Sequence, residues 1–298
     1  MEAAGVSAPA PKRSVGRRLA DLFHGRPRLQ VGALLAGPIG WLVIGYLGSL
    51  LVILITAFWG VNALSGEVEQ NFSLDNFQTI VEEPVYRTIA GRTILVAALV
   101  TITDALLAFP IAFYMAKVAS NRMKAVLVVA VLLPLWSSYL VKVYAWRTIL
   151  SSGGILNEVL DPFGIDGPGY GNVAVWLVMS YLWLPFMIIP IYAGLERIPD
   201  SVISASEDLG ASPLTTFRRV ILPLSFPAVV AGSIFTFALT LGDYITPSLV
   251  SNNQFIGNVV YSNIVNNQPL ASAFVMVPVV VMIIYLLIAR RLGAFEHL

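Results

Sequence analysis

The segment Leu195–Pro227 reads LERIPDSVISASEDLGASPLTTFRRVILPLSFP. The positions of its proline, glycine and serine residues predict two short helices joined by a tight turn. Pro199 and Asp200 are good residues to open a helix, which then runs to about Leu209. Gly210 follows, and glycine is the residue that most readily adopts the positive φ of a tight turn. The first half of the segment therefore predicts a helix that ends at a glycine turn.

The second half of the segment predicts another short helix. Ser212 is a good N-cap residue and Pro213 a good first helical residue, so we expect a helix over Pro213–Val220. Pro223 and Pro227 are expected to stop it. An ordinary connector between two apolar segments rarely contains about thirty structured residues. The helix–turn–helix therefore predicts a specific role for this loop.

The composition places the loop in an integral membrane protein. Of the 298 residues, 57% are hydrophobic and 12% are charged. Soluble globular domains carry about 25% charged residues, so this chain has too few charges to cover a surface in water. The composition excludes a nucleic-acid-binding protein, a disordered scaffold and a cytosolic enzyme. The net charge of +1 gives no bulk attraction for a polyanion.

The sequence lacks the residues that most metal, redox and nucleotide sites require. It has no cysteine, and its two histidines, His24 and His297, lie in the tails. Disulfides, thiolate chemistry, haem ligation and a His/Cys metal site are therefore excluded. No phosphate-binding loop of the form G-x-x-x-x-G-K-[ST] occurs, so any ATP must be hydrolysed by another polypeptide. We expect no catalytic residue, no metal site and no cofactor in this chain.

Apolar stretches long enough to cross a bilayer predict an all-α membrane protein with six spanning helices. A hydrocarbon core of about 30 Å needs roughly 20 helical residues. The first stretch is too long for the apolar region of a signal peptide and no A-x-A cleavage site follows it, so we expect it to be retained. The six predicted spans are Leu34–Trp59, Arg92–Met115, Val126–Trp146, Val173–Leu195, Ala228–Val250 and Ser272–Ile288.

Lysine and arginine gather on one side of the predicted membrane, which places both termini in the cytoplasm. We expect residues 1–30 to form a basic cytoplasmic tail that fixes topology or touches anionic lipid. Residues 31–298 are expected to form a single transmembrane domain, whose cytoplasmic loop covers about 196–227. Fourteen of the 18 basic residues fall on this side: Lys12, Arg13, Arg17, Arg18, Arg26, Arg28, Lys117, Arg122, Lys124, Arg197, Arg218, Arg219, Arg290 and Arg291.

The connections on the opposite side are long, at roughly 60–91, 147–172 and 251–271, and the last is rich in asparagine and glutamine. Such loops are either simply solvated or form a rim on which an extracytoplasmic partner docks. The sequence leaves both interpretations open.

The 196–227 loop resembles a loop of ABC-importer permeases that has the form E-A-A-x3-G-x9-I-x-L-P. Ser204 stands where that family has glutamate, and Ser206 where it has the second alanine. Glu207 and Asp208 are the neighbouring candidates to replace the missing glutamate. The positions that fall at the family's spacing are Ala205, Gly210, Val220, Leu222 and Pro223.

Four further stretches resemble the spermidine/putrescine branch of these permeases. The resemblance covers nearly the whole chain beyond the first thirty residues. The stretches are PLWSSYLVKVYAW (Pro134–Trp146), GGILNEVL (Gly153–Leu160), LGDYITPSL (Leu241–Leu249) and IGNVVYS (Ile256–Ser262).

This resemblance implies a type I ABC importer permease fold and a complex of several chains. The complex would contain a second permease, expected to be a different chain, two copies of a cytoplasmic ABC ATPase and an extracytoplasmic substrate-binding protein. ATP and Mg²⁺ would bind the ATPase subunits. The 213–220 helix would be the coupling helix, seated in a cleft of the ATPase whose closure rocks the spans between inward- and outward-facing states. The implied coupling residues are Ala205, Glu207, Asp208, Gly210, Pro213, Phe217, Arg218, Leu222 and Pro223.

Charged side chains inside a span cost at least about 2.5–3.5 kcal/mol on insertion scales, so each predicts a function or a partner. Asp243 extends a polar stripe of the fifth span, at spacings that place four side chains on one helix face. A carboxylate beside Tyr244 suits an alkylammonium through an ion pair and a cation–π contact. The alternative is a pair with Lys142 or a backbone donor. The stripe contains Ser233, Thr236, Thr240 and Asp243.

The third span places Trp136, Tyr139, Lys142 and Trp146 on one broad face. These side chains either line the pathway or pack in the bundle and at the interface belt. Lys142 would repel a polyamine in the pathway unless an acid neutralises it, and it can instead snorkel to the outer interface. Asp104 of the second span is a further pathway candidate, and its alternative is a buried polar link between spans.

The leading hypothesis is a permease subunit of an ATP-driven importer for putrescine, spermidine or a similar small organic cation. Related permeases carry thiamine, ferric iron, phosphonates or opines on a similar frame, and these remain alternatives. A stand-alone secondary transporter would leave the 204–223 loop unexplained. A membrane-embedded enzyme would need a nucleophile or metal constellation, and the sequence contains none.

Overall fold

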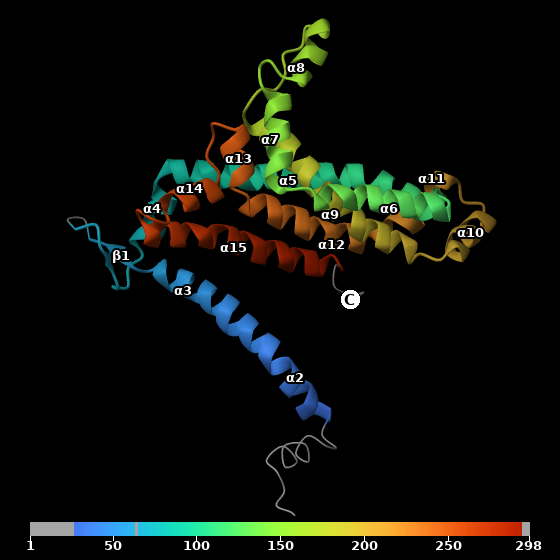
Figure 1. Ribbon diagram of the computed structural model, residues 1–298. Helices are drawn as coiled ribbons and strands as arrows, with labels where there is room; N and C mark the ends of the chain where they lie inside the picture. The colour runs from blue at the N-terminus through green and yellow to red at the C-terminus, as the bar shows by residue number, and fades with distance from the viewer. Residues whose placement is uncertain (1–26, 63–64, 294–298) are drawn as a thin grey trace, which may run out of the picture. The chain divides into compact units, whose positions relative to one another are not determined.

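The structure, a computed structural model, describes residues 27–62 and 65–293 (Figure 1). The two histidines and most of the basic N-terminal tail lie outside these residues. The chain divides into two compact units, Met1–Ile55 and Thr56–Leu298. Apart from one two-stranded antiparallel ladder in the second unit, the regular elements of the described residues are helices.

The elements follow one another along the chain as helices and two short strands, with η for 3₁₀ and π segments. They are α2 (Pro27–Trp41), η1 (Leu42–Leu47), α3 (Gly48–Thr56), β1 (Gly60–Val61), β2 (Val68–Glu69), α4 (Asp75–Glu82), α5 (Pro84–Phe113), η2 (Tyr114–Val118), α6 (Asn121–Trp136), α7 (Tyr139–Leu150), α8 (Ile155–Leu160), η3 (Asp161–Phe163), α9 (Asn172–Glu196), α10 (Asp200–Asp208), α11 (Pro213–Thr216), η4 (Phe217–Ile221), α12 (Leu222–Gly242), α13 (Ile245–Val250), α14 (Ile256–Asn263) and α15 (Gln268–Arg291).

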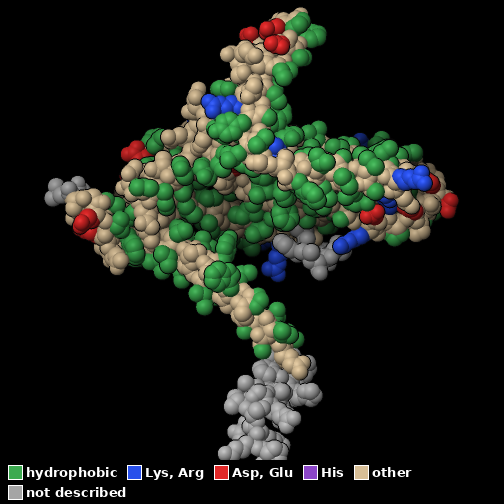
Figure 2. All heavy atoms as spheres, in the orientation of Figure 1, with side chains coloured by type: hydrophobic (Ala, Val, Ile, Leu, Met, Phe, Trp, Pro, Cys, Tyr) green, Lys and Arg blue, Asp and Glu red, His purple; other side chains and the backbone are tan. Residues whose placement is uncertain are grey.

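Within the described residues, five helices are long and apolar enough to cross a membrane, and a sixth span results if the bent pair α6–α7 is counted as one. The prediction of six spans is therefore confirmed if α6 and α7 together form one span. The five helices are Gln30–Thr56, Pro84–Val118, Asn172–Glu196, Pro213–Gly242 and Gln268–Arg291. Figure 2 shows hydrophobic side chains over the long helices of the second unit.

The third span is broken, whereas the sequence predicted one continuous helix. Helices α6 and α7 meet at 90°. Ser137 and Ser138 between them are extended, and the Ser137 hydroxyl donates to the carbonyl of Pro134 at 2.8 Å. Serine side chains compete in this way with the helical hydrogen bonds of the backbone. The prediction that Trp136 shares a face with Tyr139 is therefore wrong, because the two residues lie on different helices.

The fifth span also differs from its prediction at both ends. Pro223 and Pro227 do not stop the preceding helix, because the π segment η4 joins α11 and α12 into one span, Pro213–Gly242. Local π adjustments are a known way for membrane helices to accommodate proline. At the other end the helix stops at Gly242, since Asp243 is extended with ψ 126°. The predicted helical stripe therefore ends before Asp243.

Helix α9 is the centre of the second unit and packs against both α5 and α12. Small residues permit the close approach of α9 and α12. A Cβ added at Gly194 would collide with the Cβ of Ala228, and one added at Gly232 would lie 2.8 Å from the sulfur of Met187. These contacts hold the long helices side by side, with α10 and α11 near one end of the bundle and α4, α13 and α14 near the other (Figure 1).

The amide-rich loop near the second end is ordered by its own side chains. Asn258 accepts a hydrogen bond from the Phe255 N–H at 3.0 Å and donates to the Ser248 hydroxyl at 2.6 Å. Asn267 accepts from the Leu270 N–H at 3.2 Å, at the start of α15. Of the two interpretations of this loop, simple solvation does not describe these asparagines, because they cap helices.

Candidate functional site: a helix pair and a junction of broken spans

The helix pair α10–α11 is built as the sequence predicts. Gly210 lies between the helices with a φ of +78°, in the left-handed region that favours glycine. The Ser212 hydroxyl caps α11 by accepting from the Thr215 N–H at 3.3 Å, and Pro213 follows as the first helical residue. The turn and the start of the second helix are therefore confirmed.

Side-chain contacts fasten this helix pair to the rest of the bundle. The Ser206 and Thr216 hydroxyls are 2.9 Å apart and join α10 to α11. Lys117, at the end of η2, donates to Asp200 Oδ1 at 2.8 Å and to the Ile198 carbonyl at 2.6 Å. This hydrogen bond and the charge of the ammonium hold the pKa of Asp200 below its ordinary value.

Phe217, the first residue of η4 after α11, packs against α5. Its ring stands edge-on to Phe109 at 5.6 Å and to Phe113 at 6.3 Å, both on α5. Phe217 is half-buried and acts as a packing residue, whereas the other eight predicted coupling residues are exposed. The exposed ones are Ala205, Glu207, Asp208, Gly210, Pro213, Arg218, Leu222 and Pro223.

Two leucines complete this exposed surface and were not singled out from the sequence. Leu209 is 89% exposed at the end of α10, and Leu214 is 57% exposed on α11. Exposed leucines on either side of a glycine turn offer apolar area for a partner. The sequence offered no specific signal for either leucine. The surface combines apolar side chains with both signs of charge.

Asp243 stands at the break between α12 and α13, and its carboxylate is fully engaged. Oδ1 accepts the N–H groups of Ile245 at 2.8 Å and Thr246 at 3.2 Å, so it caps α13. Oδ2 accepts the Thr246 hydroxyl at 2.7 Å and the Tyr139 hydroxyl at 2.5 Å. One carboxylate therefore ties α7, at the break in the third span, to the start of α13, which follows the end of the fifth span.

Aromatic side chains surround this junction. Tyr139 stacks on Trp183 of α9 with centroids 5.9 Å apart. Tyr244, next to Asp243, stacks on Tyr261 of α14 at 4.8 Å. The sequence singled out Tyr139 and Tyr244 but missed Trp183, Tyr261 and the hydroxyl of Thr246. The D-x-x-T spacing, typical of a helix cap, was the signal for Thr246.

The polar stripe of α12 faces the interior of the unit. Ser233, Thr236 and Thr240 are buried, and each donates to a carbonyl of its own helix. Ser233 also accepts the Tyr285 hydroxyl at 2.8 Å and so links α12 to α15. These hydroxyls are covered in this conformation.

The other two intramembrane charges do not pair with Asp243. Lys142 donates to the carbonyl of Pro134 at 3.0 Å, across the break in the third span. Asp104 is fully buried, and neither of its oxygens has a donor among the described residues. In the described part of the chain, ion pairs join Lys117 to Asp200 and Lys124 to Glu196.

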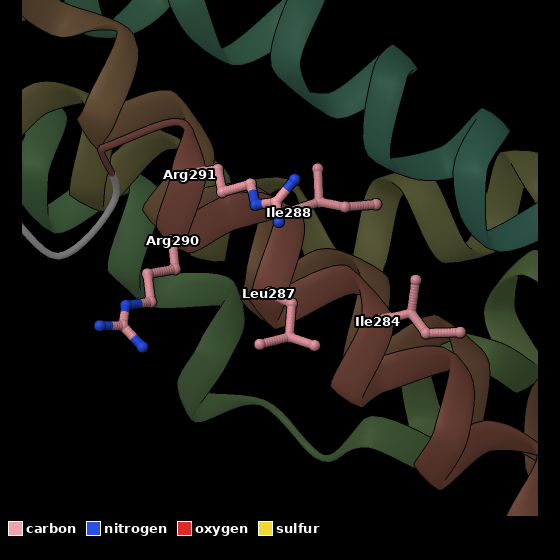
Figure 3. A pocket seen from close by; sticks show the side chains of 5 residues that line it. All are labelled: Ile284, Leu287, Ile288, Arg290 and Arg291. Atoms are coloured by element: carbon pink, nitrogen blue, oxygen red, sulfur yellow. The ribbon is translucent and has the colours of Figure 1, made fainter.

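Two hollows on the second unit lie away from the junction. One, of about 580 Å³, is lined by the last turns of α15; Figure 3 shows its lining residues, Ile284, Leu287, Ile288, Arg290 and Arg291. The other, of about 560 Å³, lies between α9 and α12 beside Gly194 and Arg197. No group of three His, Cys, Asp or Glu in the described residues could hold a metal ion.

Comparison with known proteins identifies relatives along nearly the whole chain. A family model described as "Binding-protein-dependent transport system inner membrane component" matches residues 88–294. The inner membrane ABC transporter permease protein YdcU of Escherichia coli K12 is 42% identical, over 97% of this chain and 98% of the relative. The spermidine/putrescine transport system permease protein PotB of the same organism is 31% identical, over 85% of this chain and 94% of the relative.

Solved structures show the same fold at low sequence identity. A chain of a bacterial ABC transporter that imports the acidic polysaccharide alginate superposes with a TM-score of 0.70 at 18% identity, over 92% of this chain and 99% of that one. In a second structure the alginate transporter is in complex with an alginate-bound periplasmic protein, and the TM-score is 0.72, over 93% and 97% of the two chains. A chain of the MetNI methionine ABC transporter gives 0.55 at 16% identity, over 70% and 96%.

Proposed function

This chain belongs to the family of binding-protein-dependent transport system inner membrane components, and from that premise we propose that it conducts putrescine, spermidine or a similar small organic cation. It is a permease subunit of an ABC importer, with the all-α importer-permease fold, and a multi-pass protein of the inner membrane. Permease subunits are not enzymes, and the ATPase is a separate subunit. The substrate is the proposed part.

The observation that carries the substrate proposal is the Asp243 junction. The third span is broken and the fifth span ends at Gly242, and one carboxylate joins α7 to the start of α13 at this place. Backbone that is not helical at membrane depth is tolerated where it is buried in protein or lines a water-filled cavity. An alkylammonium can replace the Tyr139 hydroxyl at Oδ2 and lie against the Tyr139, Tyr244 and Trp183 rings.

Relatives support the same substrate class. PotB relatives named for spermidine and putrescine cover most of this chain at 31% identity. The 42% identical relative carries no substrate in its name. Thiamine and ferric iron are the alternatives that also bring a positive charge to Asp243, whereas a phosphonate would be repelled by this carboxylate. Opines remain candidates only because related permeases of similar fold carry them.

The helix pair α10–α11 is proposed to couple the bundle to the ATPase. Its exposed surface around Gly210 would contact one of two ATPase copies, which hold ATP and Mg²⁺. This assigns α10 and α11 to the cytoplasm, with both termini on the same side, as the distribution of lysine and arginine favours. A second, different permease and an extracytoplasmic binding protein would complete the importer.

The test is uptake of labelled putrescine and spermidine in cells that lack this gene and any redundant polyamine importer. Asp243→Asn keeps an oxygen to cap α13 but removes the charge, so we expect uptake to fall by at least tenfold. Thr246→Val removes a cap hydroxyl but keeps the charge, so uptake should stay within about threefold of the wild type. Each variant is compared at equal membrane abundance.

Uptake that persists in the deletion strain would overturn the polyamine assignment. Equal loss in both variants would show that Asp243 acts through the fold rather than through its charge. The importer architecture would survive either result, and the first result would call for another substrate.

A further inference from the structure

A buried carboxyl group lies in the middle of the contact between α5 and α9 and takes no part in the junction described above. Asp104 is fully buried on the inward face of α5, one turn from Val100 on one side and one turn from Ala108 on the other. Beside it, the Trp176 indole of α9 donates to the Thr103 hydroxyl at 3.0 Å and so fixes the register of the two helices. Asp104 therefore lies inside the unit, where no other chain reaches it in this conformation.

Neither oxygen of the Asp104 carboxyl group has a hydrogen-bond donor among the described residues. The hydroxyl that faces it belongs to Ser180, four residues after Trp176 on the same face of α9, and that hydroxyl is also buried without a partner. An ionised carboxylate only accepts hydrogen bonds, at about four lone-pair sites, and a well-stabilised one accepts two or three. One serine hydroxyl does not supply them.

In the described part of the chain, no counter-charge compensates for a negative charge at this position. Helices α12 and α14 both pack against α5 and contain no charged residue. The nearest charged residues of α5 and η2 are 12 and 13 positions from Asp104, which is about 18–20 Å along a helix. Lys142 of α7 is engaged by the Pro134 carbonyl, and Tyr181 of α9 packs on Trp146. The charged residues of α5 and of the elements packed against it are Asp75 and Glu82 of α4, Arg87 and Arg92 of α5, Lys117 of η2 and Glu196 at the end of α9.

Space and charge together limit what can bind this carboxyl group. An uncompensated carboxylate inside a membrane protein is so costly that the group takes up a proton instead. A metal ion or an alkylammonium needs room and further oxygen ligands, whereas Asp104 has no exposed surface. A proton needs no room, and it converts the carboxyl group into a donor for the unpaired Ser180 oxygen.

We propose that Asp104 is a proton-binding site, which in this conformation holds a neutral acid that donates to Ser180 and links α5 to α9. The packing of α5 on α9 then depends on a bound proton. Unfolding releases this proton, because an aspartate in water ionises above a pKa of about 3.9. The folded state therefore binds one proton more than the unfolded state, and its stability falls as pH rises. The site does not depend on which substrate the permease conducts.

The first experiment measures the unfolding equilibrium of the full-length chain in one detergent from about pH 5 to about pH 7. For each pH unit, the unfolding equilibrium constant of the wild type should rise roughly tenfold more than that of Asp104→Asn, which keeps the shape and a donor but binds no proton. Asp104→Leu, of similar size, should also lack the extra slope and replaces the asparagine variant if that variant does not fold. Asp166→Asn removes an exposed carboxylate and should keep the wild-type slope.

The second experiment records the infrared carbonyl stretch of protonated carboxylic acids in the assembled importer in proteoliposomes at neutral pH. A band that the wild type shows and both Asp104 variants lack supports the proposal. Ser180→Ala should shift this band, because it removes the hydrogen-bond partner of the acid, and a band that does not move would overturn the link to Ser180. Identical spectra, or equal pH slopes, in the wild type and both Asp104 variants would show that Asp104 is ionised and would overturn the proton site.

Discussion

Gly210 determines the path of the chain between α10 and α11. Its φ of +78° costs an L-residue about 1–2 kcal/mol, and a Cβ at this position would meet no atom within 4 Å. A substitution therefore acts through the backbone and not through a clash. We expect Gly210→Val to reduce ATPase stimulation by the binding protein at least fivefold, while Gly210→Asn, a residue that tolerates the left-handed region, keeps most of it.

The pair of variants separates the turn from other causes. If Gly210→Val retained full stimulation at normal abundance, the helix pair would have no coupling role. If asparagine failed as badly as valine, the side chain rather than the backbone would be at fault.

At the residue scale, the sequence predicted those turns and helix caps that depend on one residue and its immediate neighbours. Gly210, Ser212 and Pro213 each obey a rule of turns or helix caps, and the structure confirms each one. Asp243 was identified as important but assigned to a helix. Its side chain captures the N–H groups of the next helix and so ends its own, which hydropathy alone does not reveal.

Among the elements, α10 is fastened to η2 by an ion pair that responds to pH. Lys117 lowers the pKa of Asp200, so the contact is present above the ordinary aspartate pKa of about 3.9 and is lost as pH falls through the lowered value. A spin label at Glu207→Cys should keep its mobility from pH 7 to about pH 5 and become more mobile below about pH 4.

Asp200→Asn is the matched control for this transition. It should leave the label mobile at every pH, and high salt should have a similar but weaker effect. A transition that persists in Asp200→Asn would assign the pH response to another group.

The contact between α9 and α12 depends on a glycine that has no room for a methyl group. Gly194→Ala would place two Cβ atoms in collision, and we expect the unfolding free energy to fall by about 1–3 kcal/mol. Gly91→Ala in α5 meets nothing within 4 Å and should be neutral or stabilising. Thermal unfolding of the purified permease in one detergent measures both.

A double variant tests the cause directly. Ala228→Gly removes the opposing methyl group, so Gly194→Ala/Ala228→Gly should recover most of the lost stability. Recovery would fail if Gly194 were needed for its backbone conformation.

Element boundaries were predictable where hydropathy changes and unpredictable where polar side chains intervene. The fourth and sixth spans enclose their predicted ranges. A continuous apolar run in a membrane must form a helix, because only a helix satisfies all its backbone hydrogen bonds within the segment. The break at Ser137–Ser138 falls inside such a run. Side-chain bonds to the Pro134 carbonyl stabilise the bent chain, and one of them comes from Lys142 eight residues away. That contact exists only once the chain has bent.

For the whole molecule, the sequence located the two ends of the bundle to which we assign functions, but not the contacts within each. The loop motif placed α10 and α11, and the intramembrane charge drew attention to Asp243. The convergence of α7, α12 and α13 on that carboxylate required the tertiary structure, since Tyr139 is 104 residues away in sequence. The 90° bend between α6 and α7 was likewise hidden, because it falls inside a continuous apolar run.

The two ends should fail in different ways when they are altered, because we propose that one contacts the ATPase and the other the substrate. Asp243→Asn leaves α10 and α11 intact, so we expect the importer to lose uptake of putrescine while the binding protein still stimulates its ATPase. Gly210→Val leaves the junction intact but misdirects α11, so both uptake and stimulation should fall together. Parallel uptake and ATPase measurements on the same proteoliposomes distinguish these cases. If Asp243→Asn lost both activities, the junction would serve the conformational cycle itself. The carboxylate would then act by holding α7 against the start of α13 rather than by contacting the cation.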